Sequence, residues 1–381
     1  MYELPRKDIL VSVPFVDLKT MHSDIMQEML EAVTRVAQKG NFVLGDEVEL
    51  FEEEFAKYSE TKYAVGVDSG LSALKLALLA YDIGPGDEVI VPVNTFIATA
   101  AAVTFIGAIP VFVDNPAGDY NIDVTKIEEA ITDKTRAIIP VHLYGIPADM
   151  DPIMEIAEKH DLLVLEDASQ AHGAYYKNRR VGSIGHIAAF SLYPAKNLGA
   201  FGDAGVITTN DESVIAKLKA MRNCGQVAKY QHEYAPYNHR LDTIHAAVLR
   251  IKLRELDSWN DMRRQVADWY SELLSDTSYD VPQTSSDVLP VWHLYVVKAD
   301  DREGLRKFLV DRQIGASIHY PDALHQVSYY ADLDYNDGDF PVAEQQVGRI
   351  LTLPMYPHMT RAHVEEVVEA MLMFQRAAIP Q

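Results

Sequence analysis

Asp167 and Lys196 are residue types that Schiff-base chemistry requires, and each lies in a stretch of sequence that suits this role. Asp167 ends an apolar run in LEDASQAHG, and Lys196 follows in FSLYPAKNLGAFGDAG, with Ser191 five residues before it. A lysine amine condenses with an aldehyde, and a carboxylate beside a pyridine nitrogen keeps that nitrogen protonated. Hydroxyl groups and turn amides can bind a phosphate. These segments therefore predict a site for pyridoxal 5′-phosphate (PLP).

The surroundings of Lys196 differ from those of an ordinary surface lysine. Most lysines in loops are solvated, but this one lies among Pro194, Ala195, Leu198 and Gly199. Glycines allow the backbone to approach a ligand closely. Removal from water lowers the pKa of an amine, which makes it a better nucleophile and proton carrier. We therefore expect Lys196 to be a catalytic residue.

A possible phosphate site precedes this pair in the chain. The sequence VDSGLSALKLAL, residues 67–78, predicts a strand end, a Ser-Gly turn and the start of a helix. The free amides of Gly70 and Leu71, together with the helix dipole, would attract an anion, and Ser191 would add a hydroxyl group. A Ser-Gly before a helix is also ordinary capping, so this pattern alone is weak.

Three further side chains have both a structural and a functional interpretation. Phe96, in NTFIAT, could belong to the core or could lie flat on a cofactor ring. Gln170 and His172 follow Asp167 closely and could reach a ring hydroxyl group or a substrate. A single histidine such as His172 is more often a packed residue.

Apolar runs recur through the first part of the chain and are continuously apolar, as in strands covered on both faces. Helical patterns separate most of them, which indicates an α/β fold with a mostly parallel sheet. Ligands of such sheets gather at the carboxyl ends of the strands, where Asp167 lies. The seven runs begin at Tyr63, Glu88, Ile109, Ala137, Leu162, Ile187 and Gly205, and helices are predicted at 71–80, 96–107, 123–132 and 151–160.

The pattern changes after about Thr243, where HAAVLRIKLRELDSW predicts a long connecting helix. The region beyond it combines strand-like WHLYVV, a helix around 304–312 and a final amphipathic helix from Thr360. We therefore predict a large domain over residues 1–250 and a smaller α+β domain over residues 251–381.

Composition excludes several classes of protein. Lys and Arg total 34 against 56 for Asp and Glu, and the resulting charge of -22 argues against nucleic-acid and anionic-membrane surfaces. The uncharged stretch 89–113 exceeds the usual membrane-spanning length, but Pro92, Gly107 and Pro110 interrupt it, so we expect a strand–helix–strand unit instead. Cys224 is the only cysteine, which excludes an internal disulfide and favours the cytoplasm.

Other ligand motifs are absent or incomplete in this chain. Neither G-x-G-x-x-G opening a helix after the first strand nor G-x-x-x-x-G-K-[ST] occurs, so dinucleotide and P-loop sites lack support. The segment 332–340 is similar to a calcium loop, but Asp337 takes the position of the required glycine and Ala343 that of the bidentate glutamate. We expect no metal.

Taken together, the ordered motifs resemble the DegT/DnrJ/EryC1/StrS family of sugar aminotransferases. The resemblance covers nearly the whole chain and implies the aspartate aminotransferase-like (type I) PLP fold, with a seven-stranded sheet flanked by helices. The motifs are specific only together: PFVDL, FVLGDEVELFEEEFA, DSGLSALKLAL, PVNTFIATA, PVFVD, PVHLYGIPADMDPI, LEDASQAHGA, FSLYPAKNLGAFGDAG, YNHRLDTIHAAVL, IHYP and LPMYPHMT.

The resemblance assigns a role to each matching residue. Lys196 would form the Schiff base, Asp167 would face the ring nitrogen, Gln170 would contact the ring hydroxyl group and Phe96 would stack on the ring. The phosphate would be held by Gly70, Leu71 and Ser191, and by Asn238 from a neighbouring subunit, which implies a homodimer with shared active sites. Our candidates for contacts to the sugar or its phosphates are Tyr193, His319 and Tyr320, although His319 and His325 could equally be structural.

Three positions depart from the family pattern. Leu71 stands where a threonine is usual, so a phosphate-binding hydroxyl group is lost, although Ser72 is adjacent. Ala101 replaces a common asparagine and Ile146 a common glutamine. The first change could weaken binding of the cofactor, and the other two could alter substrate contacts.

The resemblance also implies a reaction. L-glutamate would donate its amino group through PLP, with Lys196 shuttling the proton, to C3 of a dTDP-linked 3-keto-6-deoxyhexose in deoxyaminosugar biosynthesis. An alternative acceptor is C4 of a nucleotide-linked 4-keto sugar. Two other classes remain: a PLP-dependent dehydratase, which has a histidine at the lysine position, and a non-enzymatic sensor on the same fold.

Overall fold

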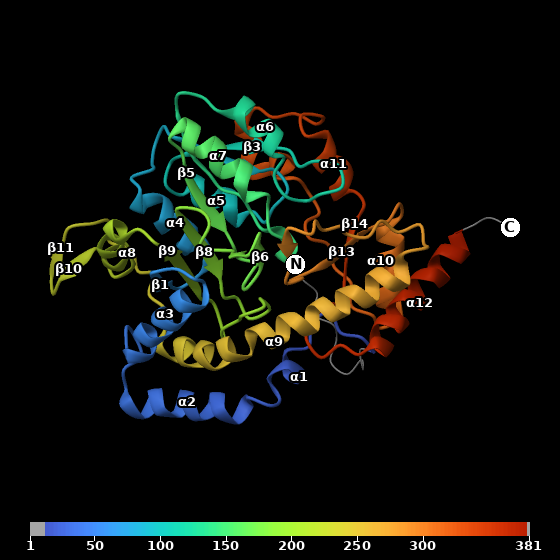
Figure 1. Cartoon of the computed structure of the whole chain (residues 1–381), viewed down its shortest axis with the longest axis horizontal. Coiled ribbons are helices and arrows are strands. Elements are labelled where there is room, and N and C mark those ends of the chain that lie inside the picture. The colour runs from blue at the N-terminus through green and yellow to red at the C-terminus, as the bar shows by residue number, and fades with distance from the viewer. Residues whose placement is uncertain (1–11, 379–381) are drawn as a thin grey trace.

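A central sheet of seven strands organises the computed structural model, which describes residues 12–378 (Figure 1). The strand order is β1-β9-β8-β5-β4-β2-β3. All neighbouring strands are parallel except β9, which is antiparallel to both β8 and β1. The seven predicted strands are thus confirmed, and they comprise β1 (Tyr63–Val67), β2 (Glu88–Pro92), β3 (Ile109–Val113), β4 (Thr135–Ile138), β5 (Leu163–Asp167), β8 (Ile187–Ser191) and β9 (Gly205–Thr209).

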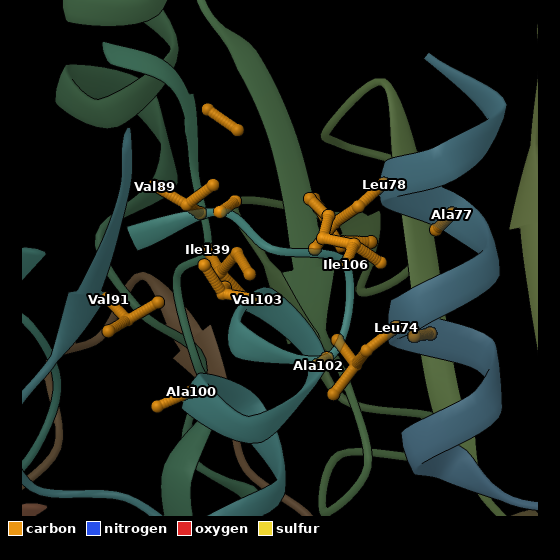
Figure 2. Close-up of a cluster of buried hydrophobic side chains, with 14 of the residues drawn as sticks. Leu74, Ala77, Leu78, Val89, Val91, Ala100, Ala102, Val103, Ile106 and Ile139 are labelled. Atoms are coloured by element: carbon orange, nitrogen blue, oxygen red, sulfur yellow. The ribbon is translucent and has the colours of Figure 1, made fainter. Parts of the chain in front are cut away.

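Helices cover both faces of this sheet. Successive side chains of each strand point to opposite faces, and they are apolar on both. On one face, α4, α5 and α8 pack against residues such as Val89, Val91 and Ile139, as Figure 2 shows for α4 and α5. On the other face, α3, α6, α7 and α9 pack against Ile90 and Phe190 among others. The bounds are α3 (Asp46–Tyr58), α4 (Gly70–Ala80), α5 (Ala98–Thr104), α6 (Val124–Ile127), α7 (Met150–His160), α8 (Ile215–Arg222) and α9 (Thr243–Leu274).

The predicted helices are present, with corrected ends. The helix expected at 96–107 is shorter, since α5 begins at Ala98 and a left-handed Gly107 follows its C-terminus. The helix expected at 123–132 is α6 followed by a 3₁₀ turn. Segment 89–113 forms β2, α5 and β3 as predicted, and within residues 12–378 no helix is long and apolar enough to cross a membrane.

The C-terminal region has its own core and confirms the α+β composition predicted for it. The antiparallel pair β13 (Tyr295–Lys298) and β14 (Ile350–Leu353) packs with helices and with the end of α9. Figure 1 shows α9 running from beneath the central sheet to this region. Since α9 continues through residue 250, the division at 250/251 lies inside a helix, and the domain limits stay a prediction. The other helices here are α10 (Arg302–Asp311), α11 (Pro341–Val347) and α12 (Arg361–Ala378).

Shorter elements complete the molecule. Helices α1 (Leu18–His22) and α2 (Met26–Lys39) precede α3, and α2 packs against α9. The hairpin of β10 (Gln226–Ala228) and β11 (Gln231–His232) projects from the molecule at the left of Figure 1. A small sheet contains β6 (Tyr175–Tyr176), β7 (Arg179–Arg180) and β12 (Val288–Leu289).

The pleat of β5 sends two adjacent carboxylates to opposite faces of the sheet. Glu166 is fully buried on the α7 side, where its Oε1 accepts hydrogen bonds from the backbone N–H groups of Ile184 (2.8 Å) and Gly185 (2.7 Å). Its Oε2 accepts from Gly182 N (2.9 Å) and His142 Nε2 (3.0 Å). Burial acts to raise the pKa of Glu166, but His142 and these amides hold it below the ordinary value. Glu166 thus fixes the end of β5.

We expect Glu166→Gln to lower the free energy of unfolding by about 2–4 kcal/mol, because a carboxamide has one acceptor oxygen for four donors. The measurement is chemical denaturation of the cofactor-free protein at pH 7. Since the pKa of Glu166 is lowered in the folded state, the loss should shrink as the pH falls through that value. The matched control is Glu158→Gln on the exposed side of α7, which should change stability by less than about 0.5 kcal/mol.

Candidate active site

A cavity of about 440 Å³ opens at the carboxyl ends of β5 and β8, beside the N-terminus of α4. Segments of the C-terminal region around residues 293–294 and 319–320 form part of its wall. A second hollow of about 510 Å³ lies between α2, α3 and α9, but two of its arginines, Arg250 and Arg254, pair with its own glutamates. The first cavity brings together ten of the eleven predicted site residues: Gly70, Leu71, Phe96, Asp167, Gln170, Ser191, Tyr193, Lys196, His319 and Tyr320.

Asp167 is held at the end of β5 with both carboxylate oxygens engaged. Thr99 Oγ1, from α5, donates a hydrogen bond to Oδ2 (2.7 Å), and the backbone N–H of Ser169 donates to Oδ1 (3.2 Å). Neutral donors orient this carboxylate without neutralising it. It is therefore suited to face a protonated ring nitrogen, as the sequence predicts.

Lys196 lies in the loop after β8, which the surrounding backbone holds tightly. A Cβ at Gly199 would lie 2.3 Å from Pro194 O, so only glycine fits there, and Lys252 Nζ donates to Gly199 O (2.6 Å). Burial lowers the pKa of the Lys196 amine to about 8, although the negative charge of Asp167 acts to raise it. The amine is thus available in its neutral form near physiological pH.

The N-terminus of α4 and the end of β8 form a cradle for an anion. A Cβ at Gly70 would lie 2.6 Å from Ser191 Cβ, so glycine allows the helix to approach the serine. Ser69 caps α4 by accepting from Ser72 N (3.1 Å), which leaves the first amides of the helix free of side-chain caps. The donor set of two amides and a hydroxyl group fits a phosphate.

Ser72 does not replace the hydroxyl group that Leu71 lacks. Its Oγ accepts a hydrogen bond from Ser69 Oγ (2.9 Å) and contacts His239 Nδ1 (3.2 Å). Ser72 is buried and does not line the cavity, whereas Leu71 does. The cradle therefore has one hydroxyl donor fewer than the usual family sequence, with threonine at position 71, would provide.

The side walls of the cavity are aromatic and amide groups. Gln170 Oε1 accepts from Tyr144 N (2.6 Å), and Gln170 Nε2 donates to Tyr320 Oη (3.1 Å), which fixes the amide. The Phe96 ring lies 5.4 Å from the Tyr320 ring and is half exposed. A flat heterocycle fits between such groups, with Gln170 at its edge.

The remaining predicted residues fall into three environments. His319 Nδ1 lies 2.9 Å from Thr352 Oγ1, and burial and then Lys196 lower the pKa of His319 to about 4, so its ring is neutral. His172 is fully buried behind the cavity, and His325 contacts Glu344 away from it. Asn238 is exposed and does not line the cavity of its own chain.

Several residues of the site were not predicted from the sequence, among them the acidic Asp203, which lines the cavity. Thr99 orients Asp167, Phe15 stacks on His319 with ring centroids 5.7 Å apart, and His293 lines the cavity. Phe15 and His293 belong to PFVDL and WHLYVV, which were noted only as motifs. Their approach to Lys196 depends on tertiary contacts that no local pattern reveals.

We expect the Lys196 amine of the cofactor-free protein to react with acetic anhydride with a midpoint near pH 8, because burial disfavours its charged form. Asp167→Asn should move the midpoint lower, since it removes the charge that favours the ammonium form. Peptide mass spectrometry after competitive labelling measures both, with the exposed Lys307 as internal reference. A midpoint near 10.5 in the wild type would contradict this description of the site.

The family is established by comparison with known proteins. Residues 23–372 match the DegT/DnrJ/EryC1/StrS aminotransferase family. The chain is 46% identical over 359 residues to the dTDP-3-amino-3,4,6-trideoxy-alpha-D-glucose transaminase of Streptomyces venezuelae, an alignment that covers 94% of this chain and 95% of that protein. It is 45% identical over 358 residues to the dTDP-3-amino-3,6-dideoxy-alpha-D-galactopyranose transaminase of Aneurinibacillus thermoaerophilus, covering 94% and 98%.

The fold agrees with this assignment. The crystal structure of S. venezuelae DesV in complex with a ketimine intermediate is similar to this structure with a TM-score of 0.93 at 45% identity, covering 97% of this chain and 99% of that chain. The expected type I fold is thus confirmed. The chain belongs to the DegT/DnrJ/EryC1/StrS family and is a PLP-dependent sugar aminotransferase.

Proposed function

We propose that this enzyme transfers the amino group of L-glutamate to C3 of a dTDP-linked 3-keto-6-deoxyhexose. The observation that carries the proposal is one cavity that holds a lysine amine of lowered pKa beside the oriented carboxylate of Asp167. The names of the two relatives support the acceptor, since both are transaminases of dTDP-3-amino sugars. A lysine at position 196 argues against the dehydratase alternative.

Each residue around the cofactor has a separate task in this proposal. When bound, PLP supplies an aldehyde that carries the amino group and a ring that accepts electrons. Asp167 keeps the ring nitrogen protonated, and Gln170 and Phe96 orient the ring from its edge and its face. Gly70, Leu71 and Ser191 hold the phosphate.

Lys196 moves the protons. Its neutral Nζ removes the proton from the α-carbon of L-glutamate in the first half-reaction. In the second half-reaction it places a proton on C3 of the sugar. A base of pKa about 8 does both near neutral pH, because it gains and loses a proton readily there.

The sugar is expected to lie against Tyr193, His319 and Tyr320, which line the cavity. Tyr193 is 53% exposed, so its ring is accessible to an incoming ligand. His319 is neutral at physiological pH and so contributes hydrogen bonds rather than charge. Specificity for a 3-keto sugar then depends on hydroxyl contacts.

A homodimer fits the position of Asn238. This residue is exposed, and the neighbouring β10–β11 hairpin carries Tyr230 at 80% and Val227 at 45% exposure. An arm that projects apolar side chains is typical of a segment covered by another chain. Asn238 would then reach the phosphate cradle of its partner.

The unpaired Cys224 favours a reducing compartment, the cytoplasm.

The acceptor is tested with a panel of dTDP- and UDP-linked 3-keto and 4-keto sugars, with L-glutamate as donor and mass spectrometry of the products. We expect amination of the dTDP-linked 3-keto-6-deoxyhexose, and a fall of about 10³-fold or more in Lys196→Ala. The control is L-glutamate alone, which should change the absorbance of the bound cofactor in the wild type. Faster amination at C4 would instead support the alternative substrate class.

Hybrid dimers test the shared site. Asn238→Ala should weaken binding of PLP by about tenfold, since a hydrogen bond to a charged group is lost. A tagged hybrid of one Lys196→Ala chain and one Asn238→Ala chain should recover activity, because one of its two sites has both residues intact. If Asn238 acted within its own chain, each site of the hybrid would keep a defect and activity would stay low.

A further inference from the structure

A hydrogen-bond network outside the cavity joins the segment 237–240 to the first turns of α4. His239 Nδ1 lies 2.9 Å from Asp68 Oδ2 and 3.2 Å from Ser72 Oγ. The other ring nitrogen of His239, Nε2, lies 2.7 Å from Lys75 Nζ, although the two residues are 164 positions apart in the chain. Neither His239 nor Lys75 lines the cavity. The network therefore has a role other than direct contact with a ligand there.

The charged partners of His239 determine the state of its ring. The ammonium group of Lys75 has hydrogens to donate and cannot accept, so His239 Nε2 is the acceptor. The hydrogen of the neutral ring is then on Nδ1, which donates to the carboxylate of Asp68. One neutral ring thus connects a cation to an anion, and this arrangement gives the ring a single orientation.

The rings of Tyr237 and His239 lie on the same side of the segment. They stack with centroids 5.6 Å apart and planes 19° apart, and Lys75 Nζ lies 4.2 Å from the centroid of the Tyr237 ring. The backbone between them is extended, since Asn238 forms an antiparallel bridge with Asn223. Successive side chains of an extended chain point to opposite sides. Asn238 therefore points away from the α4 of its own chain, which agrees with its exposure.

The backbone contacts of this segment are few. Cys224 N donates to Tyr237 O (2.7 Å), and His239 N donates to Arg222 O (2.9 Å). Such a short two-stranded pairing is only marginally stable by itself. The side-chain contacts with α4 are therefore needed to keep Asn238 in one direction.

We propose that His239, held between Lys75 and Asp68, is a positioning residue that directs Asn238 toward the cofactor phosphate in the partner subunit. The proposal rests on the homodimer proposed above. Helix α4 then serves two sites, because its first amides belong to the cradle of its own chain and Lys75, in its second turn, anchors the segment that reaches the other site. Loss of His239 should weaken binding of PLP in the neighbouring site and not in its own.

The alternative is that the network supports the cradle of its own chain, because Ser72 belongs to the first turn of α4. Contacts that do not involve His239 already hold that turn, however. Ser69 Oγ accepts from Ser72 N (3.1 Å) and donates to Ser72 Oγ (2.9 Å), and Gly70 lies closely against Ser191. These contacts remain when His239 is replaced, so its own cradle should be almost unaffected.

Hybrid dimers in which only one chain carries Lys196 make one site visible at a time. Full-length chains with different tags are combined, one of them Lys196→Ala, and the cofactor-free hybrid is incubated with increasing PLP and reduced with borohydride. The attached cofactor gives the half-saturating PLP concentration of the site that has the lysine, without turnover. The variant is His239→Phe, which keeps a ring to stack on Tyr237 and removes both hydrogen bonds.

We expect His239→Phe on the Lys196→Ala chain to raise the half-saturating concentration by about three- to tenfold, because the visible site then receives a misdirected Asn238. The same substitution on the chain that keeps Lys196 should change the concentration by less than about twofold. Lys75→Met should give the same pattern, since it removes the donor to His239 Nε2. Lys75→Gln, which keeps a donor, should stay close to the wild type.

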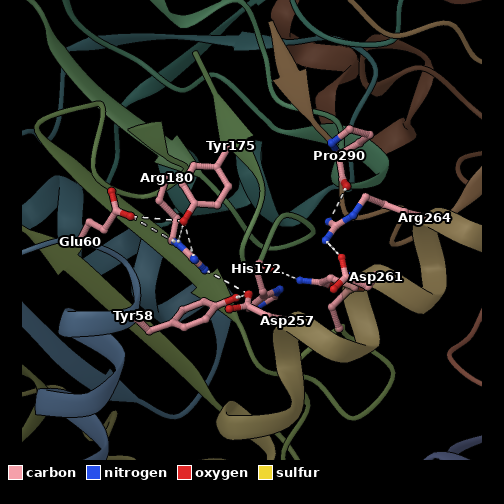
Figure 3. Close-up of polar contacts among 11 residues, drawn as sticks. Tyr58, Glu60, His172, Tyr175, Arg180, Asp257, Asp261, Arg264 and Pro290 are labelled. Atoms are coloured by element: carbon pink, nitrogen blue, oxygen red, sulfur yellow. Dashed lines mark hydrogen bonds and ion pairs between the residues drawn. The ribbon is translucent and has the colours of Figure 1, made fainter. Parts of the chain in front are cut away.

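The matched control is Asp257→Asn, in a polar cluster that joins other elements of one chain (Figure 3). Asp257 Oδ1, on α9, accepts from Tyr58 Oη of α3 (2.6 Å) and from Arg180 Nη1 of β7 (3.4 Å). None of these three residues lines the cavity. Asp257→Asn should therefore leave the half-saturating concentration unchanged on either chain. Thermal unfolding of each variant checks that the fold is retained.

The inference is overturned if His239→Phe acts equally from both chains, acts more strongly from the chain that keeps Lys196, or has no effect. Failure of the shared site itself is recognised with Asn238→Ala in the same two hybrids. If Asn238→Ala acts only from the chain that keeps Lys196, or from neither, the shared site fails and the inference fails with it. If Asn238→Ala acts from the Lys196→Ala chain while His239→Phe does not, only the inference fails.

Discussion

The pleat of one strand, β5, gives two adjacent residues different roles, one structural and one chemical. Glu166 points to the α7 face, where four donors compensate for its burial. Asp167 points to the α5 face and into the cavity. A shift of one residue in the register of β5 would exchange these positions. It would bury a carboxylate without donors and remove the charge that the cofactor requires.

The electrostatics at the reacting amine depend on Lys196 and the carboxylate of Asp167. Burial lowers the pKa of Lys196, and the carboxylate of Asp167 is the charge that opposes this. The neighbouring rings of His293 and His319 are kept neutral by burial and by the lysine itself. Two opposing effects, burial and the charge of Asp167, therefore set the pKa of Lys196 near 8, a value on which proton transfer depends. The overall charge of -22 does not oppose an anion here, since the cradle offers it amides and a hydroxyl group.

The sequence was sufficient where chemistry and local pattern coincide. Continuous apolar runs predicted all seven strands, and the Ser-Gly turn predicted the start of α4 within one residue. Prediction from the sequence failed where tertiary contacts determine the local structure. The first turn expected from Phe96 is absent because α5 starts only at Ala98, which leaves the Phe96 ring to line the cavity. Ser72, which is adjacent to the hydroxyl group lost at Leu71, is engaged by Ser69 and His239. His293 was unpredictable because its partner, Asn197, lies 96 residues away in the chain.

Helix α9 explains how a region so distant in sequence comes to build the site. Three of its buried polar residues form hydrogen bonds with loops and not with one another. They are Lys252, Asn260 and Arg263. Lys252 holds Gly199 O and Asn260 holds Asn197, so both fix the loop that carries Lys196. Arg263 Nη1 donates to the carbonyls of Trp292, His293 and Met355, which belong to the C-terminal region. Because one rigid helix carries all three, the lysine loop and the His293 segment are held in a fixed relation. The active site therefore depends on both regions being folded around α9.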